Sequence, residues 1–133
     1  MEMDICFPEG QKVNANFDDF EIKTDQSVYS GGTGEAPDPF SLFLSSIGTC
    51  TGIYVLRFCQ KRNIPTDSLK LVLKTKENEK TGLVEKIDIT IHAGEGFPEK
   101  YKNAVLKVAS LCSVKKHLEN PPSIELNFSQ DES

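Results

Sequence analysis

Two cysteines, Cys50 and Cys112, are the residues of this sequence that could perform redox chemistry as a pair of thiols. Cys50 lies near the middle of residues 39–56, a segment without a charged side chain, and Cys112 lies in the later segment "LCSVKKHL". A thiol that an oxidant converts to sulfenic acid can be captured by a second thiol as a disulfide. The two cysteines are far apart in the sequence, so only a tertiary contact could pair them.

Packing in the hydrophobic core is the competing interpretation of these thiols, because free cysteine is among the most buried residue types. Cys6 falls in a predicted strand, where we expect it to act as a small hydrophobic residue. Cys59 lies about 180° around the same predicted helix from Cys50. We therefore expect Cys59 to point away from the surface that Cys50 faces and to be chemically inert.

A metal site made from Cys50, Cys112 and His117 is a further alternative. Zinc sites usually draw their ligands from closely spaced pairs, and these three residues show no such pairing. His92 falls at the end of a predicted strand, where a surface position is the simpler interpretation. We expect no metal.

The segment around Cys50 reads as one long helix over residues 39–62. Asp38 supplies a side-chain cap, and Pro39 suits the first helical turn. Asn63 and Pro65 end the pattern. The helix is apolar around most of its circumference, which indicates burial on more than one side. Small residues would let another backbone approach it closely: Ser45, Ser46, Gly48 and Gly52.

The other predicted elements surround this helix in the sequence. Alternation of apolar and polar residues predicts strands at 3–7, 12–17 and 20–25, a hairpin from 68–76 and 83–92, and a last strand at 123–128. A glycine-rich loop covers 25–37, and a second helix covers 98–118. This order favours an α+β fold of two long helices against a mostly antiparallel sheet, in a single domain over 1–133.

Composition disfavours several classes of partner. A net charge of −5 over 133 residues disfavours binding to nucleic acid or to an anionic membrane. The opening "MEMDICFPEG" does not resemble a secretory signal, and four cysteines without one suggest free thiols in a reducing, cytoplasmic setting. Residues 39–56 approach the length of a membrane span, but hydroxyls, glycines and a proline interrupt them, so we expect a buried soluble helix.

The stretch "GGTGEAPDPFSLFLSSIGTCTG", followed later by "LCSVKKHL", resembles the OsmC/Ohr family of osmotically inducible and organic hydroperoxide resistance proteins. That family combines a glycine-rich loop, a helix that begins with proline, and a turn of small residues that ends in Gly-x-Cys. A second cysteine, in a Cys-x-Val motif, lies on the next long helix. The order of elements also matches, so the resemblance covers nearly the whole chain.

The resemblance implies an intertwined homodimer that reduces organic hydroperoxides in defence against oxidative stress. Cys50 would be the peroxidatic thiol and Cys112 the resolving thiol, both at the dimer interface. No cofactor beyond an external dithiol reductant is implied. The ligand would be a small hydrophobic peroxide or another apolar small molecule.

Peroxidases of the family activate their thiol with an arginine from the N-terminal strands, held by a glutamate at the start of the central helix. This sequence has no arginine before Arg57, and Phe40 or Ser41 stands at the glutamate position. A non-catalytic or weakly active ligand-binding or redox-sensing protein of the same fold therefore stays open. The candidates for the activating and supporting roles are Lys12, Lys23, Glu35, Asp38 and Arg57.

Overall fold

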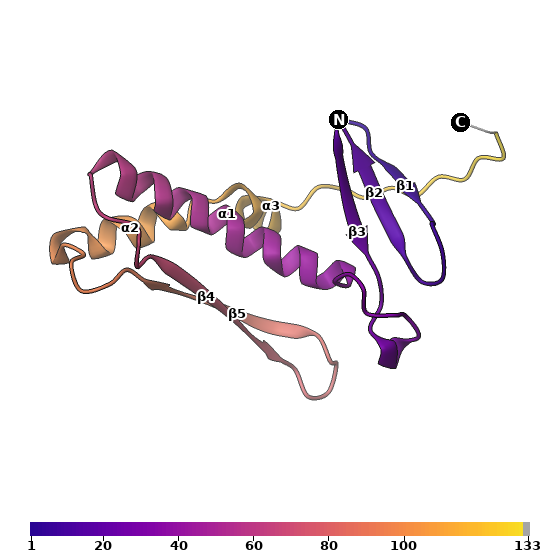
Figure 1. Cartoon of the computed structure of the whole chain (residues 1–133), viewed down its shortest axis with the longest axis horizontal. Coiled ribbons are helices and arrows are strands. Elements are labelled where there is room, and N and C mark those ends of the chain that lie inside the picture. Colours follow the sequence, from indigo (N-terminus) through magenta and orange to yellow (C-terminus); the bar gives the residue numbers. More distant parts are fainter. Residues whose placement is uncertain (132–133) are drawn as a thin grey trace. The chain divides into compact units, whose positions relative to one another are not determined.

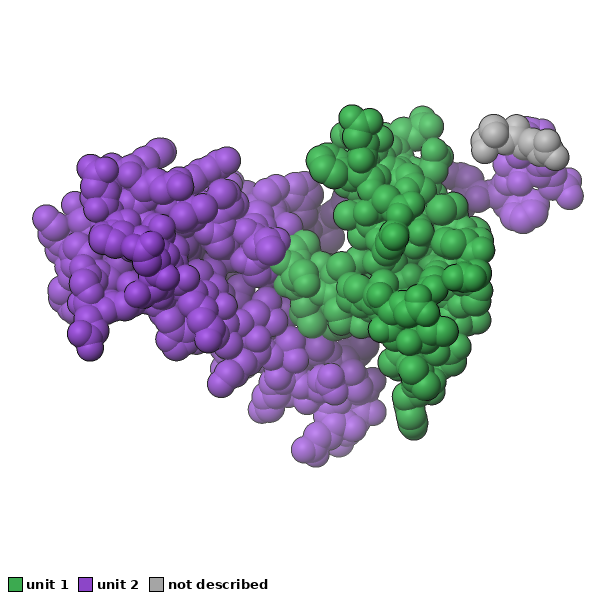
Figure 2. Space-filling view, viewed as in Figure 1, with its two compact units in different colours: residues 1–46 green, residues 47–133 purple. Residues whose placement is uncertain are grey.

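The computed structural model describes residues 1–131 and divides into two compact units, which Figure 2 colours separately. The first unit comprises residues 1–46, and the second begins at Ile47. The boundary falls within the long helix α1 (Pro39–Lys61).

The first unit contains a three-stranded antiparallel sheet in the order β1 (Asp4–Cys6), β2 (Val13–Phe17), β3 (Phe20–Thr24), visible in Figure 1. Asp18 forms the tight turn between β2 and β3 with a φ of 50°, a conformation that aspartate tolerates better than most residues. The three predicted N-terminal strands are confirmed. The predicted loop that follows contains one 3₁₀ turn, η1 (Val28–Ser30).

The helix α1 begins and ends where its sequence signals predict. The Asp38 carboxylate accepts hydrogen bonds from the Ser41 N–H, at 3.3 Å, and from the Ser41 hydroxyl. Such a cap satisfies backbone donors that the first turn leaves without partners. Beyond the last turn, Asn63 adopts a φ of 53°, the left-handed conformation that commonly terminates helices.

The second unit packs α1 against helix α2 (Lys102–Ala109) and the antiparallel hairpin of β4 (Lys70–Glu77) and β5 (Val84–His92). Its core is a cluster of buried side chains from α1, α2 and the loop after α1. The members are Val55, Phe58, Cys59, Ile64, Val105 and Ala109.

The prediction of a second long helix over 98–118 is wrong. The structure has η2 (Glu99–Tyr101), then α2, then a short helix α3 (Ser113–Glu119). The break comes at Cys112, whose backbone is extended (ψ 142°) and whose thiol accepts the Lys115 N–H as the N-cap of α3. The apolar spacing continues through this point, but local hydrogen bonding ends one helix and starts another.

The predicted last strand at 123–128 is also wrong: this segment has no regular secondary structure and belongs to neither sheet. Its three apolar side chains are nearly fully exposed, at 86% for Ile124, 95% for Leu126 and 89% for Phe128. The strands of residues 1–131 form two separate antiparallel sheets, one in each unit, where the sequence predicted one sheet.

Candidate functional site

The thiol of Cys112 is completely buried and lies against the part of α1 that carries Cys50. Its Sγ accepts the backbone N–H of Lys115 at 3.3 Å and lies 3.8 Å from the hydroxyl of Thr51, the residue after Cys50. The start of α3 therefore contacts α1 at the residue that follows Cys50. All four cysteines are reduced in the structure.

Cys50 differs from Cys112 in its exposure. It is half-buried on α1, whereas no part of Cys112 reaches solvent. Cys50 is therefore the more accessible of these two residues to a molecule that arrives from solvent.

An apolar cleft of about 340 Å³ opens beside Cys112. Thr51 and Lys115, the two residues that contact the buried sulfur, both line it, and Lys115 also pairs with Glu119 at 3.8 Å. Side chains of β5 and of the three helices complete the walls. They are Ile47, Ile87, Ile89, Ile91, Leu106, Ala109, Ser110 and Leu118.

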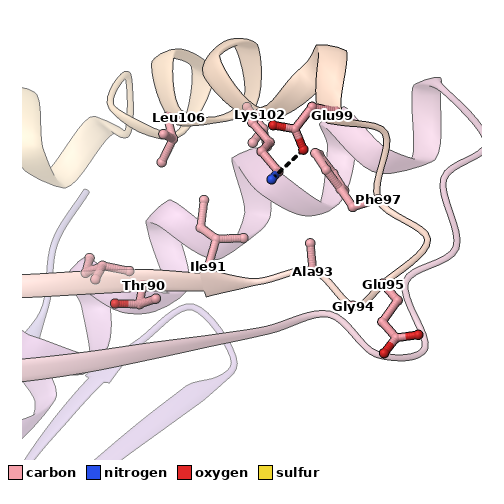
Figure 3. Close-up of a pocket in the computed structure, with 11 residues that line it drawn as sticks. Thr90, Ile91, Ala93, Gly94, Glu95, Phe97, Glu99, Lys102 and Leu106 are labelled. Carbon is pink, nitrogen blue, oxygen red and sulfur yellow. Dashed lines mark ion pairs between the residues drawn. The ribbon is translucent and has the colours of Figure 1, made fainter.

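A larger cleft of about 560 Å³ adjoins the first, because Ile89, Ile91 and Leu106 line both. Figure 3 shows the Glu99–Lys102 ion pair, at 2.6 Å, on the helical side opposite β5. No cysteine lines this larger cleft. It extends the apolar surface along β5 and supplies no redox group of its own.

The remaining cysteines lie in different surroundings. Cys59 is part of the core, where burial raises the pKa of its thiol, an effect that the charge of Arg62 partly opposes. Cys6, in β1, is half-buried and its sulfur accepts the side-chain amide of Asn16 at 3.3 Å.

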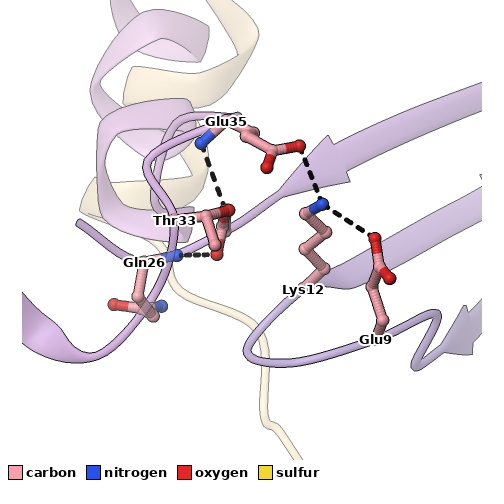
Figure 4. A network of polar contacts seen from close by, with 6 residues as sticks. Glu9, Lys12, Gln26, Thr33 and Glu35 are labelled. Atoms are coloured by element: carbon pink, nitrogen blue, oxygen red, sulfur yellow. Dashed lines mark hydrogen bonds and ion pairs between the residues drawn. The ribbon is translucent and has the colours of Figure 1, made fainter. Parts of the chain in front are cut away.

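In the first unit, Lys12 and Glu35, two of the candidate supporting residues, form an ion pair (Figure 4). The Lys12 Nζ lies 2.9 Å from Glu35 Oε2 and 3.0 Å from Glu9 Oε1. The hydrogen bonds that Lys12 donates to Glu35 and to Glu9 raise the pKa of Lys12, and the bond that Glu35 accepts from Lys12 lowers the pKa of Glu35. A cation from the connection between β1 and β2 is thus held by a glutamate that precedes α1.

Asp25 organises the loop that carries Glu35, a role that the sequence reasoning missed. Its buried carboxylate accepts hydrogen bonds from the N–H of Gln26 at 2.7 Å, the hydroxyl of Thr33 at 2.7 Å and the N–H of Glu35 at 3.1 Å. These bonds, the Thr33 bond above all, lower the pKa of Asp25 to about 2. An aspartate directly after a strand and before a glycine-rich stretch was the available signal.

The other candidates occupy separate positions. Lys23 pairs with Glu21 at 3.6 Å on an exposed strand, Asp38 caps α1, and Arg57 is exposed on α1. The Ser41 hydroxyl lowers the pKa of Asp38. No group of three potential metal ligands occurs within residues 1–131.

Comparisons with known proteins identify the family of the chain. A sequence model of the family described as OsmC-like protein matches residues 32–127. No curated protein gives a significant match.

Solved structures show the same fold at low sequence identity. A protein of Psychrobacter arcticus 273-4, named as a candidate osmotic stress induced and detoxification response protein, is 20% identical with a TM-score of 0.72, over 86% of this chain and 85% of that one. An OsmC-like protein from Mycoplasma pneumoniae is 14% identical with a TM-score of 0.70, over 90% and 87%. An organic hydroperoxide resistance protein OsmC from Legionella pneumophila is 15% identical with a TM-score of 0.54, over 89% of both chains.

Proposed function

The chain belongs to the family of OsmC-like proteins, and on this premise we propose that it reduces organic hydroperoxides with the thiols of Cys50 and Cys112. The observation that carries the proposal is the contact between the Cys112 sulfur and Thr51, next to Cys50. The contact supports a pairing of two cysteines far apart in the sequence, because a disulfide needs their Cα atoms within about 7 Å of each other.

The proposed reaction has three steps. The Cys50 thiolate attacks the terminal peroxide oxygen, the O–O bond breaks, and the departing alkoxide takes up a proton to give the alcohol and a sulfenic acid. The Cys112 sulfur then attacks the Cys50 sulfur, the S–O bond breaks, and water leaves with the Cys112 proton. An external dithiol reduces the resulting disulfide, which suits a protein that works in the reducing cytoplasm.

The exposure of the two sulfurs supports this division of roles. Half-buried Cys50 can meet a peroxide from solvent, and fully buried Cys112 is protected until its partner has been oxidised. The apolar cleft beside Thr51 favours a peroxide with a hydrophobic body over hydrogen peroxide. We propose small hydrophobic hydroperoxides as the substrate class.

We assign the activating charge to Lys12 and its support to Glu35. Among the candidate residues, these two form the cation–carboxylate pair that the chemistry calls for. Lysine is a point charge and lacks the planar fork with which arginine can orient a thiolate and a peroxide together. We therefore propose a slower peroxidase than one that uses arginine.

A ligand-binding or redox-sensing protein is the second candidate. Lys12 already donates hydrogen bonds to two carboxylates, Glu9 and Glu35. Their negative charges offset the stabilisation that Lys12 could give to a thiolate. In that case the cleft beside Cys112 would hold an apolar ligand, and the dithiol would form a disulfide without rapid turnover.

We further propose that the protein is an intertwined homodimer. The helix α1 has the length and apolar character of a membrane span, as core helices of soluble proteins also do. Only 28% of its most apolar window is buried within the chain. The segment 123–128 exposes Ile124, Leu126 and Phe128 at alternate positions, the pattern of a strand that is covered on one face. A second copy would cover both.

The test of the proposed function is consumption of cumene hydroperoxide by the pure protein with a dithiol reductant. Cys50→Ser should abolish turnover, and Cys112→Ser should allow one turnover but prevent recycling through the disulfide. Cys6→Ser serves as the matched control and should leave the rate unchanged. A Cys50→Ser variant with full activity would refute the mechanism, and an inactive wild-type protein would favour the ligand-binding candidate.

A further inference from the structure

The Thr51 hydroxyl has one proton and two neighbours that could receive it. Its Oγ1 lies 2.8 Å from the carbonyl oxygen of Ile47 and 3.8 Å from Cys112 Sγ. One proton serves one of these as a strong bond, and the carbonyl oxygen is both nearer and the better acceptor. The hydroxyl therefore donates to Ile47, and its lone pairs remain available to the thiol.

The Cys112 thiol also has one proton and two neighbours. Its sulfur already accepts the Lys115 N–H, which occupies the acceptor side. The sulfur is fully buried, so no water can receive the S–H proton. Among the contacts of this sulfur in the structure, Thr51 Oγ1 is the oxygen within hydrogen-bonding distance.

We propose that Thr51 is a positioning residue for Cys112: its hydroxyl oxygen accepts a hydrogen bond from the thiol and holds the sulfur against the turn of α1 that carries Cys50. Lys115 fixes the sulfur from α3, and Thr51 fixes it from α1. The hydrogen bond stands independently of any activity, whereas its use in disulfide formation rests on the proposed function.

The contact belongs to the reduced state. When the S–S bond forms, the S–O bond of the Cys50 sulfenic acid breaks, and the Cys112 proton leaves in the released water. The Cys112 sulfur then has no proton to donate, so the Thr51 oxygen loses this donor. Thr51 thus holds the sulfur before the reaction and releases it afterwards.

Infrared spectroscopy tests the hydrogen bond directly, because the S–H stretching band moves to lower frequency when the thiol donates. The full-length protein is measured reduced, and a Cys112→Ala difference spectrum identifies the Cys112 band. Thr51→Val keeps the side-chain shape without the oxygen and should move this band to higher frequency. Thr51→Ser keeps the oxygen and should leave the band in place. Thr51→Ala removes the same oxygen, and it is measured in place of Thr51→Val if the valine variant does not fold.

The rate of Cys50–Cys112 disulfide formation after one equivalent of cumene hydroperoxide gives the functional readout. Loss of one hydrogen bond should slow the step about fivefold in Thr51→Val, and Thr51→Ser should stay within about twofold of wild type. An unchanged S–H band in Thr51→Val overturns the inference. A shifted band with an unchanged rate overturns the positioning role alone. A shifted band in a protein that never forms the disulfide supports the hydrogen bond and refutes the proposed function instead.

Discussion

Replacement of Gly32 by alanine should damage the loop around Asp25. A Cβ atom at Gly32 would lie 2.1 Å from the carbonyl oxygen of Gln26 and 2.7 Å from Asp25 Oδ1. Both distances are far inside van der Waals contact, and the nearer atom belongs to the backbone, so the loop must shift. Because the Asp25 carboxylate also binds the N–H of Glu35, the shift should reach the Lys12–Glu35 ion pair.

The magnitude follows from the cost of overpacking, which is typically about 1–3 kcal/mol. A clash with two polar atoms at once falls at the upper end, so we expect the free energy of unfolding to fall by about 2–3 kcal/mol. For a domain of this size, that corresponds to a decrease in Tm of roughly 10 °C. Urea denaturation and thermal melting measure both quantities.

Gly96→Ala is the matched control. No heavy atom lies within 4 Å of a Cβ built at Gly96, so this substitution should leave the free energy of unfolding within about 0.5 kcal/mol of wild type or raise it slightly. If Gly32→Ala is as stable as Gly96→Ala, the loop tolerates the methyl group, and the proposed role of Asp25 in fixing Glu35 fails.

Three further predictions concern Asp25, Lys12 and the C-terminal segment. The folded pKa of Asp25, about 2, lies below its ordinary 3.8, so its carboxylate should stabilise the fold above about pH 4 and lose this effect as the pH falls through about 2. Asp25→Asn should flatten that part of an unfolding curve measured against pH, and an unaltered pH dependence would contradict the assignment. Lys12→Met should slow peroxide turnover and Lys12→Arg should make it faster. Lys23→Met, at an exposed position, should leave the rate unchanged. Equal effects of the two methionine variants would show that Lys12 does not activate the thiol. Leu126→Asp should convert a dimer to the 14.8 kDa monomer in sedimentation, and a wild-type protein that already sediments as a monomer would contradict the homodimer.

The sequence predicted the elements whose signals are local. The Asp38–Pro39 start and the Asn63 stop defined α1 because capping and left-handed termination depend on neighbouring residues. The N-terminal strands and the hairpin followed from alternation for the same reason. In both cases the tertiary structure agrees with the local preference.

The errors arose where long-range contacts or local hydrogen bonds override periodicity. The apolar spacing through Cys112 favoured a continuous helix. Instead, the Cys112 thiol caps α3, and the non-helical backbone of this residue separates α3 from α2. The alternation at 123–128 predicted a strand, and alternation cannot say where the partner strand comes from. Asp25 was missed because a buried carboxylate is recognised by the donors that fold around it, two of which come from residues 33 and 35.

The central claim is that Cys50 and Cys112 act together on an organic hydroperoxide. Its most direct test adds one equivalent of cumene hydroperoxide to the reduced protein without reductant, followed by peptide mass spectrometry and product analysis. We expect one equivalent of the alcohol, a disulfide joining Cys50 and Cys112, and free thiols at Cys6 and Cys59. Unreduced peroxide with four free thiols, or a disulfide that involves Cys6 or Cys59, would contradict the account.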